Sequence, residues 1–96
     1  MMGGVREAIL QRLQPQQRDL VDRLRAQVKD QGLEEVLRRF ARDNKEQILE
    51  DELLIGISKL NANVHIQDIK ELTRILKEGN SEGKISIADT VQLIGQ

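Results

Sequence analysis

Hydrophobic residues recur along this chain at helical spacing, and no stretch of useful length alternates as a strand does. Near the start, Val5, Ile9 and Leu13 stand four positions apart, so they share one helical face. Pro15 suits the first turn of a second helix, and Gly32 suits its end, because glycine adopts the left-handed cap conformation at low cost. The apolar face of this second helix carries Leu20, Val21, Leu24 and Val28.

Further apolar stripes follow in the remaining two thirds of the chain. They predict helices over residues 33–40, 49–60 and 66–76, and a final helix of about two turns over residues 87–94. Polar segments separate the stripes, and the one at residues 78–83 has a turn-forming composition that contains two Gly, an Asn and a Ser. The pattern therefore predicts an all-α fold of about six helices with short loops.

The composition fits a single small domain and excludes several classes of protein. Of 96 residues, 39% are hydrophobic and 32% are charged, which is too apolar for a disordered tail and too charged for a membrane protein. The chain has no Cys, so it forms no disulfide and no thiolate metal site, and this absence fits the cytosol. A net charge of −1 and a single aromatic residue, Phe40, argue against nucleic-acid binding. We therefore expect no nucleic-acid partner and no membrane partner.

Residues 33–60 follow a helix–loop–helix pattern. Phe40 ends one apolar stripe, Ile48 is an apolar residue inside the polar segment that follows, and Glu52 adjoins the next stripe. This arrangement resembles an EF-hand, in which an apolar residue precedes a twelve-position loop, another occupies position 8 and a carboxylate occupies position 12. The resemblance places the first loop at residues 41–52 and implies that Phe40 is buried at the centre of the core.

The C-terminal part of the chain repeats this pattern. Gly83, Lys84 and Ile85 resemble the Gly-x-Ile of loop positions 6 to 8, and Asp89 then stands at position 12. In paired EF-hands the two loops lie side by side. The resemblance therefore implies a short antiparallel bridge between Ile48 and Ile85.

These observations predict a chain in two parts. An N-terminal helical extension at residues 1–32 would precede a degenerate EF-hand pair at residues 33–96. The expected fold is therefore all-α, an EF-hand-like helix–loop–helix pair with one or two extra N-terminal helices. The extension has a basic stretch at Arg23–Arg25 that leads through Gly32 into the next helix. This short stretch is similar to the region ahead of the first hand in calcyphosine-like and cilia-associated EF-hand proteins. The similarity implies a cytoplasmic location, with the cytoskeleton or the cilium as the narrower expectation.

The calcium ligands that the family requires are mostly missing from the first loop. Position 1 is Ala41, position 5 is Lys45 and position 9 is Leu49, and none of these side chains can give an oxygen. Asp43 and Glu52 remain, but a hard cation needs six or more oxygens. We therefore expect this loop to bind no calcium.

The second loop keeps more oxygens. The resemblance implies side-chain ligands at Glu78, Asn80, Glu82 and Asp89. In that register, however, Lys77 would occupy the apolar position before the loop, whereas the stripe assigns that position to Leu76. We expect no cofactor, and the most that this loop would do is bind calcium weakly.

The residues favour a binding module over an enzyme. The chain lacks Cys and Tyr, its glycines form no phosphate-binding signature, and its single His65 is expected to cap a helix. The expected function is therefore a non-catalytic protein–protein interaction or scaffolding module that does not need calcium. The alternative is a weak calcium-binding regulatory sensor that uses the second loop.

The partner would be an amphipathic helix of another protein or a second copy of this chain. The N-terminal helices could instead cover the EF-hand pair of their own chain, and the sequence leaves this choice open. The residues expected at the partner-binding or core groove are Leu20, Leu24, Val28, Val36, Phe40, Leu53, Ile57, Leu72 and Leu76.

Overall fold

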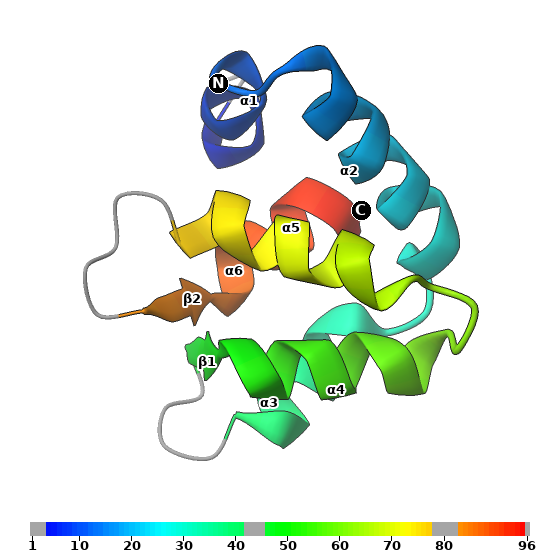
Figure 1. Cartoon of the computed structure of the whole chain (residues 1–96). Helices are drawn as coiled ribbons and strands as arrows, with labels where there is room; N and C mark the ends of the chain where they lie inside the picture. The colour runs from blue at the N-terminus through cyan, green and yellow to red at the C-terminus, as the bar shows by residue number, and fades with distance from the viewer. Residues whose placement is uncertain (1–3, 42–45, 78–82, 96) are drawn as a thin grey trace.

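The computed structural model describes residues 4–41, 46–77 and 83–95 of the chain. These residues are mostly helical, as the periodicity predicts, with one small sheet (Figure 1). In chain order the elements are α1 (Gly4–Gln11), α2 (Pro15–Val28), α3 (Leu33–Phe40), β1 (Gln47–Leu49), α4 (Glu50–Leu60), α5 (Ile66–Lys77), β2 (Lys84–Ser86), α6 (Ile87–Thr90) and the π-helix η1 (Val91–Gly95).

The local sequence explains where the N-terminal helices begin and end. Pro15 occupies the first turn of α2, and the side chain of Gln17 accepts a hydrogen bond of 2.9 Å from the backbone N–H of Gln14. The helix ends at Val28, earlier than the prediction that Gly32 terminates it. Gly32 instead stands directly before α3 with φ +77°, a conformation that only glycine adopts at low cost.

The two strands form an antiparallel pair in which Ile48 lies opposite Ile85. Both side chains are buried, and the backbone N–H of Ile87 donates a further hydrogen bond of 3.0 Å to the carbonyl of Glu46. The predicted bridge is therefore confirmed. The final helix differs from the prediction, because α6 has only four residues and η1 continues the chain as a π-helix.

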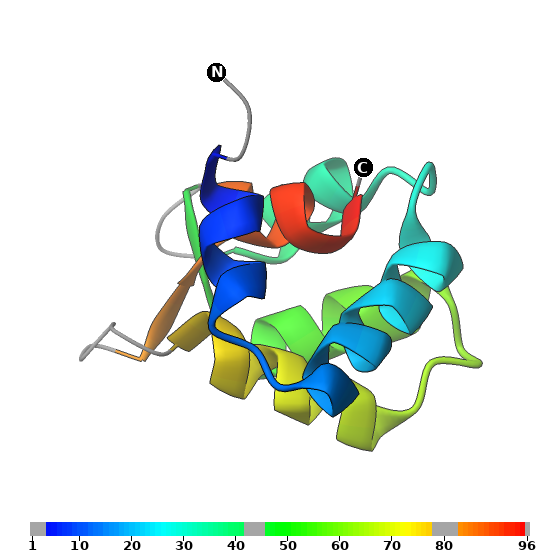
Figure 2. The ribbon, with the colours of Figure 1, turned by 90° about the horizontal axis from the view of Figure 1, so that it is seen from above.

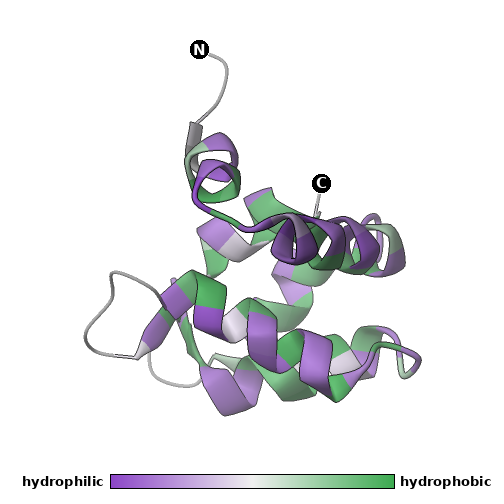
Figure 3. Cartoon of the chain, turned by 45° about the horizontal axis from the view of Figure 1, so that its top comes forward, coloured by the Kyte–Doolittle hydropathy of each residue, from purple (hydrophilic) through white to green (hydrophobic). Residues whose placement is uncertain are grey.

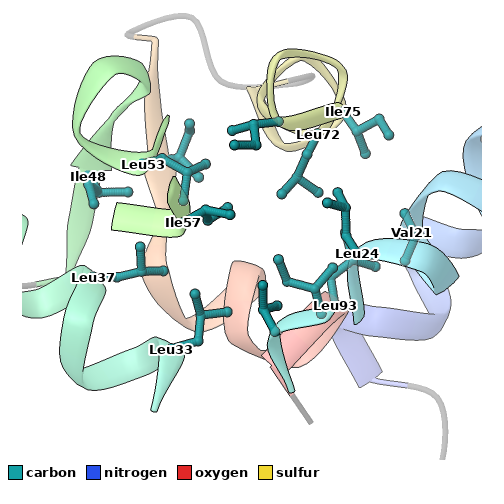
Figure 4. Packing of buried hydrophobic residues seen from close by; sticks show 14 of the residues in the cluster. Val21, Leu24, Leu33, Leu37, Ile48, Leu53, Ile57, Leu72, Ile75 and Leu93 are labelled. Carbon is teal, nitrogen blue, oxygen red and sulfur yellow. The ribbon is translucent and has the colours of Figure 1, made fainter. Parts of the chain in front are cut away.

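One continuous core runs through the molecule. Figure 4 shows Leu24 of α2 beside Leu93 of η1, with Leu72 of α5 and Ile57 of α4 facing the same interior. The π-helix η1 packs against both α1 and α2 (Figure 2). Hydrophobic positions recur between hydrophilic ones along the helices (Figure 3), and most of the large hydrophobic side chains belong to the core. The helices of residues 4–28 thus contribute to the same core as the rest of the chain.

The position of Phe40 corrects a prediction. Phe40 is only partly buried, whereas Leu33, Leu37 and Ala41 of the same segment are buried. These three stand four positions apart and form the inner face of α3, so Phe40 lies at its margin. A Cβ atom at Gly56 of α4 would lie 3.2 Å from Cδ2 of Leu37 and 3.7 Å from Cδ2 of Phe40. The helices therefore approach closely at Gly56, and Leu37 takes the central place that we predicted for Phe40.

Candidate functional site

The first candidate metal loop begins at a residue without a ligand atom in its side chain. Ala41 is buried, and its backbone N–H donates a hydrogen bond of 3.0 Å to the carbonyl of Leu37. The Ala41 side chain belongs to the hydrophobic core. Asp43 and Lys45 lie outside the described residues.

The last residue of the first candidate loop, Glu52, forms a hydrogen bond at the start of α4. The carboxylate of Glu52 accepts a hydrogen bond of 3.0 Å from the backbone N–H of Leu49. This contact satisfies a backbone donor at the helix N-terminus, and a negative charge is favourable there. Leu49, at loop position 9, presents a large apolar side chain that is 43% exposed. Glu52 thus has a structural role that needs no metal.

The second candidate loop is described only at its end. Glu78, Asn80 and Glu82, three of the four predicted metal ligands, lie outside the described residues. Asp89 is partly buried, and its backbone N–H donates a hydrogen bond of 3.2 Å to the hydroxyl of Ser86, which caps α6. Within the described part of the chain, no three His, Cys, Asp or Glu side chains gather as a metal site would require.

The residues before this loop follow the register of the stripe. Leu76 packs against the core, and the Lys77 ammonium lies 3.4 Å from a carboxylate oxygen of Glu50 on α4. On the same helix, Ile75 is buried, whereas Ile66 at its first position is 52% exposed.

The predicted groove residues are brought together, but most of them form the closed core. The buried members are Leu20, Leu24, Val28, Leu53, Ile57 and Leu72, and the partly buried members are Val36, Phe40 and Leu76. Helix α2 supplies the first three, so the chain covers its own apolar face. Of the two alternatives for the N-terminal helices, the structure has packing within the chain, because the apolar face of α2 is buried against its own core.

Polar contacts hold α2 in this position. The guanidinium of Arg23 donates two hydrogen bonds of 3.2 Å to the carboxylate of Asp68 on α5. One turn further along α5, Glu71 accepts a hydrogen bond of 3.1 Å from the side-chain amide of Gln17. The side-chain amide of Asn61, which follows α4, donates to the carbonyl of Gln27 at 3.2 Å.

A polar cavity of about 440 Å³ lies between the start of α4 and one side of α5. Its lining residues are Glu50, Lys70, Arg74 and Lys77. The hydroxyl of Thr73 donates a hydrogen bond of 2.9 Å to Oε2 of Glu50, and Nζ of Lys77 donates one of 3.4 Å to Oε1. The hydrogen bond from Thr73 has the largest effect and lowers the pKa of Glu50, and burial opposes it. The hydrogen bond and charge of Lys77 and the charge of Lys70 lower the pKa further, so the net shift is downward. Glu50 therefore stays ionised at neutral pH.

Sequence reasoning missed this cavity, although part of the signal was present. Lys70, Arg74 and Lys77 are separated by four and then three positions, which is the spacing of one helical face. The contribution of Glu50 depends on the antiparallel packing of α4 against α5, which no local pattern reveals.

Comparisons with protein-family models, with curated proteins and with solved structures give no match to this chain. Among the described residues, no helix combines the length and the apolar content needed to cross a membrane.

Proposed function

We propose that this chain is a non-catalytic protein-interaction or scaffolding module, built on a degenerate EF-hand pair that keeps its shape without calcium. The observation that carries the proposal is the antiparallel pairing of Ile48 with Ile85. It joins the unit α3–β1–α4 to the unit α5–β2–α6 at loop position 8 of each, which is where the resemblance requires contact.

Three features support a shape that does not depend on calcium. Ala41 fills a core position where a calcium-binding loop needs its first ligand, and Glu52 caps α4 where the loop needs its last. The paired Ile48 and Ile85 side chains bury apolar surface between the two units, and this burial stabilises the pair in the absence of an ion.

We assign the chain no catalytic role and no cofactor. The hydroxyls of Thr73, Ser86 and Thr90 all form hydrogen bonds with groups of the fold. Because α2 covers the apolar face of the pair, the partner binds to the outer surface of the closed domain. A cytoplasmic location, and more narrowly a cytoskeletal or ciliary one, remains an expectation of the resemblance.

Thermal unfolding in excess chelator and in about 1 mM calcium tests the proposal, with magnesium as a parallel condition. A site with a dissociation constant near 10 μM would gain about 2.7 kcal/mol at that concentration. For a domain of this size, such a gain raises the melting temperature by roughly 10 °C or more. We expect the two melting temperatures to agree within about 1 °C, since no site should be occupied.

An upward shift of several degrees would instead support the calcium sensor. The variant Asp89→Asn then locates the site, because it removes a charge from the second loop and leaves the first loop unchanged. Loss of the shift in this variant would assign binding to the second loop, with Glu78, Asn80, Glu82 and Asp89 as ligands.

A further inference from the structure

Three basic residues follow one face of α5 beside the cavity described above. Lys70, Arg74 and Lys77 provide about one positive charge per helical turn, and we call these three residues the α5 cationic face. At 1.5 Å per residue they extend over about 10 Å of the helix axis. Charges spaced over this length suit an elongated chain with several charges better than a compact anion such as phosphate.

The three basic residues differ in how strongly each is paired with an acidic residue of the chain. Lys77 is 3.4 Å from Glu50 and contributes to the contact between α5 and α4. Arg74 lies 3.5 Å from Glu71 on its own helix, but its side chain is 79% exposed, so this ion pair is weak. Lys70 is exposed, and it forms no ion pair with another described residue. Lys70 and Arg74 are therefore the charges that a ligand can engage.

We propose that the α5 cationic face docks an acidic segment of a partner protein, with glutamate or aspartate side chains on Lys70 and Arg74. The inference rests on the proposed function, since it names the surface and the partner chemistry of the interaction module. Carboxylates spaced along a peptide match charges spaced along a helix, and such complementarity speeds association and selects partners.

Features around the same face disfavour other polyanions. Glu50 at the cavity and Glu71 beside Arg74 place fixed negative charges next to the cations. These charges repel a densely charged phosphate chain more strongly than a peptide whose carboxylates are one helical turn apart. Phe40, the single aromatic residue of the chain, lies on α3, so nucleobases find no stacking partner at this face. An anionic bilayer needs a larger basic cluster than three residues with two acids among them.

The test is fluorescence anisotropy with a labelled alanine-based helical peptide that carries Glu residues one turn apart. A peptide with Gln at the same positions is its control. The protein variants are Lys70→Gln with Arg74→Gln, and a matched pair, Arg38→Gln with Arg39→Gln on α3. Each pair removes two exposed positive charges, and far-UV circular dichroism checks that both variants keep the helical content of the parent protein.

We expect the Glu peptide to bind and the Gln peptide not to bind. The change at Lys70 and Arg74 should weaken binding about two- to thirtyfold, since exposed ion pairs contribute about 0.2–1 kcal/mol each. The change at Arg38 and Arg39 should leave the affinity as it was. Binding should also fall between about 20 mM and about 500 mM salt, because exposed charges are screened.

Equal binding by the two variants, or no binding of the Glu peptide, would overturn the proposal. So would stronger binding to phosphatidylserine vesicles than to the peptide, or full competition by inorganic phosphate at low millimolar concentration, because each assigns the face to a different anion. Every titration is run in chelator and in calcium. Calcium dependence would count against the calcium-independent module, whereas equal variants would count only against this face.

Discussion

Replacement of Leu24 by Ala tests whether α2 is an integral part of the core. Leu24 is fully buried and packs towards residues of α5 and η1 (Figure 4). The truncation removes about three methylene-sized groups at about 0.8 kcal/mol each and leaves a cavity, so the cost should be about 2–5 kcal/mol. A chain of this length is stable by about 5–14 kcal/mol in total. The variant should therefore lose roughly a third of its stability.

Urea denaturation followed by far-UV circular dichroism measures this loss. We expect a single transition with a lower midpoint and an unchanged slope, because α2 shares its core with the other helices. The control is Ile66→Ala, since Ile66 is 52% exposed and its truncation should cost less than about 1 kcal/mol.

Two outcomes would refute the reasoning. A loss below about 1 kcal/mol for Leu24→Ala would mean that α2 is not packed in the core. Two separate transitions, of which only one moves in the variant, would mean that residues 1–32 fold apart from the remainder.

Two more predictions concern the contact between α4 and its neighbours. Thr73→Val removes the hydroxyl that lowers the pKa of Glu50, so NMR titration of this carboxylate should show a higher pKa in the variant. Because the folded-state pKa is lowered, the parent protein should lose this contribution to stability as the pH falls below the ordinary value of 4.5, and Thr73→Val should show a weaker loss there. Gly56→Ala should change the unfolding free energy by less than about 1 kcal/mol, because better helix propensity offsets a contact of 3.2 Å with Leu37, whereas Gly56→Leu should cost about 1–3 kcal/mol or more. A Glu50 pKa unmoved by Thr73→Val, or a Gly56→Leu protein as stable as the parent, would contradict these assignments.

The helices up to α5 and their order were predictable from the sequence, because each has a clear apolar stripe. The bridge was predictable for a different reason, since the resemblance to paired EF-hands places Ile48 and Ile85 at position 8 of two neighbouring loops. The choice of Leu37 over Phe40 was not predictable in this way. Both lie on the apolar side of α3, and the choice follows from how α3 is turned against α4, which buries Leu37 and leaves Phe40 at the margin.

The candidate site was less accessible to sequence reasoning. The missing oxygen at Ala41 follows from the sequence, but the use of Glu52 as a cap depends on backbone geometry at the start of α4. The cavity with Glu50 and the α5 cationic face depends on two helices meeting side by side. Tertiary packing decides such features, and no local pattern specifies it.

The pairing of Ile48 with Ile85 has a consequence for the order of folding. The paired residues stand far apart in the sequence, so the pairing pays a loop-closure entropy that local helices do not, and it should form late. A chain cut between α4 and α5 would leave each fragment with an unpaired strand edge beside an apolar helix face. Such edges associate readily with other strands. Each fragment would therefore be prone to pair with its complement or with copies of itself, whereas the uncut chain satisfies both edges within one molecule.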